Sequence, residues 1–532
     1  MAAEGQDYYR YCPGEEHLKL SDAVCYGRRR ANFRKCPGCQ FNDDEQGRPT
    51  YYGANVQAGK NIPLAVLERD KRDMIQKVFK AYDVRATYPD PLNEDVAWRI
   101  GNATAQFLRT ALVGYDRSDS TMNTLIVGRD MRKSSPALSR AFIEGAAAVG
   151  TPVIDIGMVD TPQIYFAANH MPCCGGVITT ASHNPPNYNG FKISGVKGKP
   201  IGAESGLQEI ERIARAISKH PSPETNRVQS LDLSADYRGF LHKLMREPRP
   251  LKVVVDASNG MAGRWFPIVF NGVPNLTVIA LNFETSGEFV HPPNPLVLAN
   301  LAQLRAAVKE HRADFGACFD GDADRCVFVD EHGEFVRCDL ITAMLAIEYL
   351  RERPGATIVY DLRSSRILPE VIEKNGGRPR RERVGHVFMK RTMADQNAVF
   401  GGELSGHLYF RDFYYCDSGL IAFIAVCNAL TRTGKPLSEL IEPLAIYASS
   451  GERNFENPDK EGTFKRLLDK YRDGEIDQLD GVTVQYKDWW FNVRASNTEP
   501  LMRLNMEAIN DTLLNAKLAE LTPLLGTPAE GH

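Results

Sequence analysis

The chain has 532 residues, of which 43% are hydrophobic and 25% are charged, and its formal net charge at pH 7 is −3. Because domains usually contain roughly 100–200 residues, we expect about three to five domains instead of one compact core. The nearly balanced charge excludes a global field that would draw the protein to nucleic acid or to an anionic membrane, so local basic groups must hold any anionic substrate.

We do not expect the start of the sequence to be a secretory signal. Its first residues, MAAEGQDYYRYCPGEE, lack the basic and apolar regions of a secretory signal. No apolar run is long enough to cross a bilayer. We therefore expect a cytoplasmic location, with no membrane or nucleic-acid partner, and the sequence leaves open a monomer or a dimer.

The eleven cysteines fall into two groups. Seven lie in apolar surroundings, which indicates reduced, buried thiols instead of a disulfide framework. These seven are Cys173, Cys174, Cys318, Cys326, Cys338, Cys416 and Cys427. The other four lie in residues 1–68, a polar segment that we interpret as an appended extension.

These four cysteines are Cys12, Cys25, Cys36 and Cys39. The last two form Cys-Pro-Gly-Cys, a tight turn that can present two thiolates to one metal, and the first two can complete a tetrahedral zinc site. Because Cys12 and Cys25 do not form a second close pair, a loose cysteine-containing tail is an equal alternative. His17 is a further candidate ligand, although a surface histidine is the simpler reading.

From about residue 78 the pattern alternates between strands and helices. Short apolar runs predict strands at 124–128, 153–157, 176–179, 252–258, 314–320 and 356–361. Helical spacing follows at 135–150, 365–376 and 417–432. This alternation predicts mostly parallel, covered sheets, whose ligands lie at the carboxyl ends of the strands.

The last stretch, from about 447, differs from this pattern. Strands dominate there before a final helix at 510–525, which predicts a smaller α+β domain. Pro- and Gly-rich joints near 220–226 and 434–436 are candidate linkers.

The first loop with chemical potential is TTASHNPPNYNGFKIS (179–194), which follows an apolar strand and is dense in turn formers. The Ser182 hydroxyl can be phosphorylated and can later donate the phosphoryl group, which Asn184 and Lys192 can neutralise and orient. The structural alternative is an Asx-rich turn.

The second loop is FDGDADRCVFVD (319–330). Asp320, Asp322 and Asp324 alternate directly after an apolar strand, and three carboxylates on one short loop suit a hard cation such as Mg²⁺. An EF-hand is excluded because Arg325 occupies the position that needs glycine. Arg325 beside the metal can contact substrate or phosphoserine oxygens.

The third loop is GGELSGHLYF (401–410). Glu403 and Ser405 lie two apart, so in an extended loop they project to the same side and can bind neighbouring sugar hydroxyls. His407 can assist them, or it can be a packed core residue.

The fourth loop is RASNTEPLMRL (494–504). Arg494, Ser496, Asn497 and Thr498 combine a guanidinium fork, hydroxyls and an amide, which suits a non-transferred phosphate. The alternative is a helix N-cap box with Glu499, which the strand-like PLMRLNME disfavours.

In this order, TASHNP, DGDADR, GELSGH and RASNTEP resemble the motifs of the α-D-phosphohexomutase superfamily, in its phosphomannomutase/phosphoglucomutase branch. The resemblance covers roughly residues 75–510. It implies an α/β fold of four domains around a central cleft: three related mixed-sheet α/β domains and a C-terminal α+β domain. We expect them at 69–228, 229–336, 337–446 and 447–532, after the Cys-rich extension.

Weaker matches add further residues to the implied site. FKAYDVR (79–85) would place Arg85 near the transferring phosphoryl group, and HPPNPL (291–296) resembles a family loop. DLRSSR (361–366) and VGHVFMK (384–390) would direct Arg363 and His386 toward the sugar. The likeness also groups His183 with the catalytic residues.

The implied reaction starts from a phosphoserine at 182, which converts a hexose 1- or 6-phosphate into a 1,6-bisphosphate. After turning round, this intermediate returns its other phosphoryl group to the serine. Mg²⁺ on the three aspartates and Ser182 would polarise the phosphoserine, and Arg85, Lys192 and Arg325 would neutralise the migrating group. His386 is the better general base, because arginine stays protonated.

Two other functions remain open. A phosphoglucosamine mutase shares the motifs, although NPPNYNGFKI and HLYFRDFYYCDSG look more like the mannose/glucose branch. A non-catalytic sugar-phosphate sensor, with the Cys-rich extension as its partner-binding module, is the more remote alternative.

Overall fold

The structure is a computed structural model that describes residues 9–12, 15–21, 73–111, 120–217, 227–496 and 501–529. The chain divides into two compact units, Met1–Asp70 and Lys71–His532. In the first unit, β1 (Tyr9–Cys12) and β2 (Glu15–Ser21) form an antiparallel hairpin that the sequence pattern did not predict. Of the candidate zinc ligands, Cys12 belongs to β1, and Cys25, Cys36 and Cys39 lie outside the described residues.

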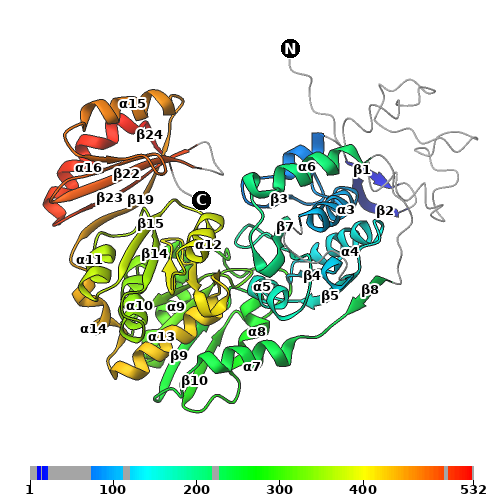
Figure 1. The fold of residues 1–532 in the computed structure, drawn as a ribbon, viewed down its shortest axis with the longest axis horizontal. Coiled ribbons are helices and arrows are strands. Elements are labelled where there is room, and N and C mark those ends of the chain that lie inside the picture. The colour runs from blue at the N-terminus through cyan, green and yellow to red at the C-terminus, as the bar shows by residue number, and fades with distance from the viewer. Residues whose placement is uncertain are drawn as a thin grey trace, which may run out of the picture. The chain divides into compact units, whose positions relative to one another are not determined.

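The first α/β domain of the second unit is built on a six-stranded sheet (Figure 1). Its strands are β3 (Val84–Thr87), β4 (Leu125–Arg129), β5 (Val153–Met158), β6 (Gly175–Thr179), β7 (Tyr188–Gly195) and β8 (Val228–Ser230). Its helices are α3 (Glu94–Thr110), α4 (Ser135–Ala147), α5 (Thr161–His170) and α6 (Leu207–Ala216). Helices α3 and α4 approach so closely that a Cβ atom on Gly101 would lie 2.0 Å from the carbonyl oxygen of Phe142, which requires glycine there.

The second α/β domain is built on a five-stranded sheet. Its strands are β9 (Leu251–Asp256), β10 (Leu276–Leu281), β11 (Phe315–Phe319), β12 (Cys326–Val329) and β13 (Phe335–Val336). Its helices are α7 (Ser234–Leu244), α8 (Met261–Phe270) and α9 (Ala302–His311). Strand β11 is buried along its whole length, as its apolar run predicts.

The third α/β domain repeats this five-stranded arrangement. Its strands are β14 (Thr357–Asp361), β15 (Arg378–Glu382), β16 (Phe400–Gly402), β17 (Leu408–Phe410) and β18 (Cys416–Asp417). Its helices are α10 (Cys338–Glu352), α11 (Ile367–Lys374), α12 (His386–Asp395), α13 (Gly419–Thr433) and α14 (Leu437–Ile441).

The last domain is a smaller α+β domain, as predicted. Its sheet has the order β20-β21-β22-β23-β19-β24 and is covered by two helices. The strands are β19 (Ala448–Glu456), β20 (Glu475–Asp477), β21 (Val482–Gln485), β22 (Trp489–Ala495), β23 (Leu501–Ala508) and β24 (Thr527–Ala529). The helices are α15 (Lys460–Lys470) and α16 (Asp511–Leu525).

The first three sheets share one topology. In each, a central strand (β4, β9 or β14) pairs in parallel with two neighbours, and the second of these (β6, β11 or β16) continues into an antiparallel strand. The sheets are therefore mixed, because a short loop joins the last parallel strand to its antiparallel neighbour. Ser182, the three aspartates and Glu403 lie in this same loop of three successive domains.

The hydrophobic cores follow the same division. One continuous core joins parts of all three α/β domains, with Tyr165, Phe266 and Phe423 among its members. The last domain has a core of its own, which includes Trp489 and Phe491. The three loops described above are thus carried by domains that share buried apolar contacts.

Two further sequence expectations can be compared with the structure. Residues 434–436 turn the chain between α13 and α14, and both helices pack on α10, so this joint lies within the third domain and the linker prediction is wrong there. The other candidate linker, 220–226, lies outside the described residues. No described helix combines the length and the apolar character needed to span a bilayer.

The prediction for the seven buried cysteines is confirmed. All seven are free thiols and buried. Burial raises the pKa of Cys173 and of Cys416 to about 12, so these thiols stay protonated and unreactive.

Candidate active site

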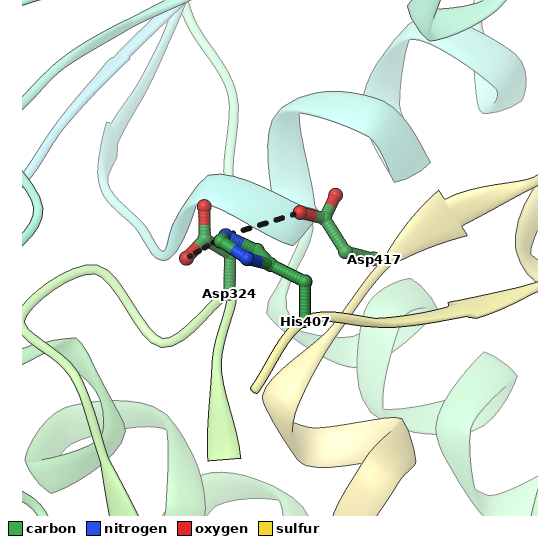
Figure 2. A group of neighbouring side chains, drawn as sticks. All are labelled: Asp324, His407 and Asp417. Carbon is green, nitrogen blue, oxygen red and sulfur yellow. Dashed lines mark ion pairs between the residues drawn. The ribbon is translucent and has the colours of Figure 1, made fainter. Parts of the chain in front are cut away.

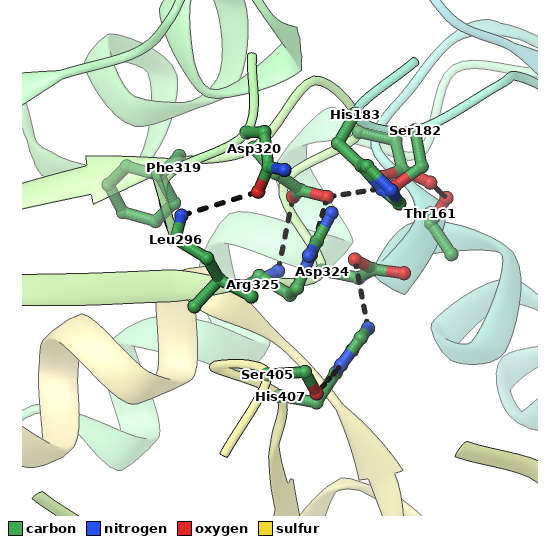
Figure 3. Close-up of polar contacts among 12 residues, drawn as sticks. Thr161, Ser182, His183, Leu296, Phe319, Asp320, Asp324, Arg325, Ser405 and His407 are labelled. Atoms are coloured by element: carbon green, nitrogen blue, oxygen red, sulfur yellow. Dashed lines mark hydrogen bonds and ion pairs between the residues drawn. The ribbon is translucent and has the colours of Figure 1, made fainter. Parts of the chain in front are cut away.

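Ser182 follows β6 and lies against the loop of the second α/β domain (Figure 3). Its hydroxyl donates a hydrogen bond to Oδ2 of Asp320 over 2.8 Å, and its Oγ lies 3.2 Å from Nδ1 of His183. The residue has a left-handed φ of 48°, which a serine adopts only where surrounding contacts hold it. The hydroxyl is therefore held in a fixed place beside a buried carboxylate.

Arg132 supplies contacts that hold this loop, and the sequence analysis missed it. Its side chain is buried and donates to the backbone carbonyls of Ser182 (2.8 Å), Asn184 (2.7 Å) and Pro185 (2.6 Å). Asp130, at the end of β4, balances its charge through a 3.2 Å ion pair. A buried strand followed by a charged pair was the available signal, because such strand ends carry the ligand-facing loops of α/β domains.

The carboxylate triad, Asp320, Asp322 and Asp324, is buried, and the oxygens of its members lie within 4.8 Å of one another. Burial raises the pKa of Asp320 to about 7 against the opposing effect of Arg325. Oδ1 of Asp322 is buried with no hydrogen-bond partner among the described residues, whereas Oδ1 of Asp324 lies 3.5 Å from Nε2 of His407. A buried carboxylate oxygen without a partner fits a hard divalent cation, which prefers such ligands.

Two further groups bind the same carboxylates. Lys192, predicted from the sequence, places Nζ 2.7 Å from Oδ2 of Asp322 and 2.5 Å from Oδ2 of Asp324. Burial would lower the pKa of Lys192, but these carboxylates raise it above its usual value, so the ammonium is permanent. Thr161, which the sequence analysis missed, donates its hydroxyl to Oδ2 of Asp322 over 2.5 Å.

Arg325 and Arg85 bring guanidinium groups to the Ser182 loop. Nε of Arg325 lies 3.0 Å from Oδ2 of Asp320, and Nη1 of Arg85 donates to Oδ1 of Asn184 over 2.6 Å. Nη2 of Arg325 and Nε of Arg85 are buried donors without a partner in the described part of the chain. Both arginines thus keep an unused N–H group for an anion such as a phosphoryl group.

These cations also act on His183. Burial lowers its pKa well below the usual range, and the charges of Arg325, Arg85 and Lys192 lower it further. The imidazole next to Ser182 is therefore neutral at pH 7.

The third loop places Glu403 and Ser405 against different partners. Glu403 is buried, and its carboxylate accepts hydrogen bonds from the Tyr409 hydroxyl and from the backbone N–H of Gly385 (3.1 Å). Oγ of Ser405 lies 2.9 Å from Nδ1 of His407. Burial raises the pKa of Glu403.

His407 connects this loop to the carboxylate triad (Figure 2). Its Nε2 lies 3.5 Å from Oδ1 of Asp324 and 3.7 Å from Oδ2 of Asp417. Asp417 is itself paired with Lys390 over 2.7 Å. His407 is therefore part of a charged network instead of the packed core residue that was its alternative.

His386 begins α12 beside this loop. Its ring centroid lies 6.5 Å from that of His407. Burial lowers the pKa of His386 well below its usual value, and the charges of Lys390 and Lys192 act in the same direction. Its imidazole is therefore neutral at pH 7.

The last predicted group lies between the third and fourth domains. Arg363 is held by Asp361, with Nη2 2.7 Å from Oδ2, and its Nη1 lies 3.4 Å from Oε2 of Glu452. Nη2 of Arg494 lies 3.1 Å from the same Glu452 oxygen. Glu452 was not foreseen from the sequence. Nη1 of Arg503 lies 3.0 Å from Oε1 of the same glutamate. We call Arg363, Arg494 and Arg503, together with Glu452, the arginine cluster.

Only part of the fourth loop is described. The backbone N–H of Ser496 donates to the carbonyl of Leu501 over 2.8 Å, and Asn497 and Thr498 lie outside the described residues. Residues from Leu501 onward form β23, so the helix N-cap alternative is wrong.

Models of one protein family match this chain in four consecutive parts. Three describe phosphoglucomutase/phosphomannomutase alpha/beta/alpha domains I, II and III and match residues 76–221, 239–333 and 339–447. The fourth describes the phosphoglucomutase/phosphomannomutase C-terminal domain and matches residues 453–522.

Individual proteins agree with these matches. A phosphomannomutase of Escherichia coli is 38% identical over 462 residues, which cover 84% of this chain and 98% of that protein. A protein of Xanthomonas campestris pv. campestris with the name "Phosphohexose mutases" is 38% identical over 459 residues, which cover 85% of this chain and 100% of that protein. The crystal structure of a phosphoglucomutase/phosphomannomutase family protein from Burkholderia thailandensis has a TM-score of 0.76 and 32% identity, covering 85% of this chain and 99% of that one.

Proposed function

The chain belongs to the phosphoglucomutase/phosphomannomutase family and is a phosphohexomutase, and we propose that its Ser182 carries the phosphoryl group. The enzyme moves this group between the 1- and 6-positions of mannose or glucose phosphates. The observation that carries this proposal is the 2.8 Å hydrogen bond from the Ser182 hydroxyl to Asp320 in the buried carboxylate triad. A nucleophilic oxygen next to a cation site is the arrangement that phosphoryl transfer needs.

The reaction then runs in two transfers. The bond between phosphorus and Oγ of Ser182 breaks while a bond forms to the free hydroxyl of the bound hexose phosphate, which loses its proton. The hexose 1,6-bisphosphate turns round, returns its other phosphoryl group to Ser182 and leaves as the isomer. Arg85, Lys192 and Arg325 neutralise the migrating group, which the unused donors of the two arginines support.

The residues of the triad, together with Ser182, would hold Mg²⁺. The buried Oδ1 of Asp322, which has no hydrogen-bond partner among the described residues, supports this assignment. When bound, the ion would withdraw electron density from the phosphoryl group and balance its charge.

His386 is the general base in this proposal. Its lowered pKa keeps the imidazole neutral at pH 7, whereas Arg363 stays protonated and orients the sugar. Glu403, Ser405 and His407 bind sugar hydroxyls in either orientation of the intermediate. Arg494, Ser496, Asn497 and Thr498 hold the phosphate that is not being transferred.

The relatives favour a mannose or glucose phosphate over the alternatives. Proteins named phosphomannomutase and phosphohexose mutases match at 38% identity over most of their length, which disfavours a phosphoglucosamine mutase or a non-catalytic sensor. A coupled assay with mannose, glucose and glucosamine 1-phosphates separates the three substrates.

Substitution of Ser182 tests the central claim. We expect Ser182→Ala to abolish turnover while hexose phosphate still binds, and we expect the intact mass of the wild-type protein to include one phosphoryl group that the variant lacks. Ser230→Ala, at an exposed serine of β8, is the matched control. Wild-type rates in the Ser182 variant, or a phosphoryl group on another residue, would refute the role.

We also propose that Cys12, Cys25, Cys36 and Cys39 bind a structural zinc ion, supported by the Cys-Pro-Gly-Cys turn. Metal analysis of the full chain should find close to one zinc per chain, and folded protein without zinc would end this proposal. A cytoplasmic location and a monomeric or dimeric state remain predictions.

A further inference from the structure

Glu452 is placed by an irregularity in its strand. The pairing of β19 with β23 shifts register between Ser449 and Glu452, and Gly451 in this bulge has a φ of 62°. A β-bulge re-aims the side chains that follow it. The side chain of Glu452 thereby faces Arg363, Arg494 and Arg503.

Three guanidinium groups meet the carboxylate of Glu452. Oε1 lies 3.0 Å from Nη1 of Arg503, and Oε2 lies 3.1 Å from Nη2 of Arg494 and 3.4 Å from Nη1 of Arg363. The side chain of Arg494 is only 3% exposed and that of Glu452 is 25% exposed. The cluster is thus largely shielded from water, where charges interact strongly.

Carboxylates other than Glu452 also surround these arginines. Nη2 of Arg363 lies 2.7 Å from Oδ2 of Asp361 and 4.0 Å from Oε2 of Glu403. Nε of Arg494 is buried and has no hydrogen-bond partner within the described ranges. An anion brought to this cluster would find this unused donor, but it would meet Glu452 already in place.

Glu452 remains ionised under ordinary conditions. Burial alone would raise its pKa, but Arg363, Arg494 and Arg503 lower the pKa to about 2. The carboxylate therefore competes with any arriving anion as a full negative charge.

We propose that Glu452 is a built-in competitor of the substrate phosphate. Its carboxylate pairs with the arginines while no phosphate is bound. Because the carboxylate has the same sign of charge as the phosphate, it weakens the binding of the arginines to the phosphate that is not being transferred. This inference rests on the proposed function, in which the bisphosphate must release that phosphate in order to turn round. Tighter binding of substrate and intermediate alike would lower KM without raising kcat, and it would slow this release.

Glu452→Gln removes the charge and keeps the size of the side chain. We expect inorganic phosphate to bind this variant roughly five- to tenfold more tightly in equilibrium calorimetry, as expected for removal of one nearby negative charge. KM for the hexose phosphate and kcat should both fall, because release becomes slower. Glu456→Gln, at an exposed glutamate of the same strand, removes the same charge outside the cluster and should change neither affinity nor kcat.

Glu452→Asp provides the second variant. It keeps the negative charge but shortens the side chain by one methylene group, which moves the carboxylate away from the arginines. Phosphate affinity should therefore rise less than in Glu452→Gln, and kcat should stay closer to the wild-type value. Unchanged or weaker phosphate binding in Glu452→Gln would overturn the proposal. If that variant does not fold, weaker binding in Glu452→Asp would overturn it as well.

The phosphate measurement is independent of the serine chemistry. It uses the full chain and inorganic phosphate without sugar, so its outcome does not depend on whether Ser182 is the donor. Suppose that Ser182→Ala keeps wild-type turnover while Glu452→Gln binds phosphate more tightly. The catalytic assignment of Ser182 would then be wrong, and the competitor role of Glu452 would still hold.

Discussion

The carboxylate triad and the arginine cluster are built from groups of opposite charge. At the triad, three carboxylates of one loop pair with Lys192, Arg325 and His407. At the cluster, three guanidinium groups meet the single carboxylate of Glu452. The chain, whose net charge is small, therefore has one buried negative centre, whose carboxylates suit a cation, and one buried positive centre, whose guanidinium groups suit an anion.

A second pair of sites shows how one local motif serves two purposes. Arg132 lies two residues after Asp130, and Arg363 lies two residues after Asp361. Each aspartate is at the end of a central strand and forms an ion pair with its arginine. Arg132 donates to backbone carbonyls and fixes the Ser182 loop, whereas Arg363 reaches Glu452 in the next domain. The motif sets the position of the guanidinium group, and the neighbouring domain sets its task.

The largest effect is expected from breaking the negative centre. Asp322→Asn removes a carboxylate with an unpaired buried oxygen, so Mg²⁺ binding should weaken and kcat should fall by about 10³-fold, comparable to the loss of a main group that stabilises charge in the transition state. Calorimetric titration with Mg²⁺ and steady-state kinetics measure the two effects. Asp395→Asn, at the exposed end of α12, is the control. Full activity of the wild-type protein after exhaustive chelation would contradict the assignment of a metal to the triad.

Breaking the positive centre should have a smaller effect with a different kinetic signature. Arg494→Met removes a buried guanidinium group, so KM should rise by roughly 10- to 100-fold for hexose 1-phosphate and for hexose 6-phosphate alike. Both values should rise because each substrate places its phosphate at this site in one half of the reaction. Arg466→Met, at a side chain that is 53% exposed on α15, controls for the lost charge. A change in KM for only one of the two substrates would argue against a shared anchor.

The smallest effect should appear in the pH dependence of stability. The pKa of Glu452 falls from 4.5 to about 2 on folding, so its charge stabilises the native state above pH 4.5, and this contribution disappears as the pH falls through 2. Compared with Glu452→Gln, the wild-type free energy of unfolding should be higher by about 1–2 kcal/mol near neutral pH, because the carboxamide still accepts hydrogen bonds. Denaturant titrations of both proteins between pH 2 and pH 6 measure the difference. A difference that grows toward low pH would have the wrong sign for a carboxylate held by arginines.

Local sequence patterns were sufficient for the central apolar strands of the three α/β domains and for the chemistry of the loops that follow them. The alternating aspartates after the apolar run at 314–320 predicted the triad, because the spacing that brings three carboxylates together is contained in one short segment. The turn-rich segment around Ser182 and the alternation of strands and helices were readable for the same reason, whereas the mixed sheets were implied only by the family resemblance. The linker predicted at 434–436 was wrong, because glycine and proline end a helix in the same way within a domain as between domains.

Only the tertiary structure decided which charges meet. Lys192 and Thr161 join the triad from the first domain, and His407 reaches it from the third. Arg363 of the third domain meets Glu452 of the last. None of these pairings leaves a pattern in the sequence, because the partners are far apart along the chain and come from different domains. A buried charge requires a partner, but the residue that supplies it is chosen by the packing of domains and not by its neighbours in the chain.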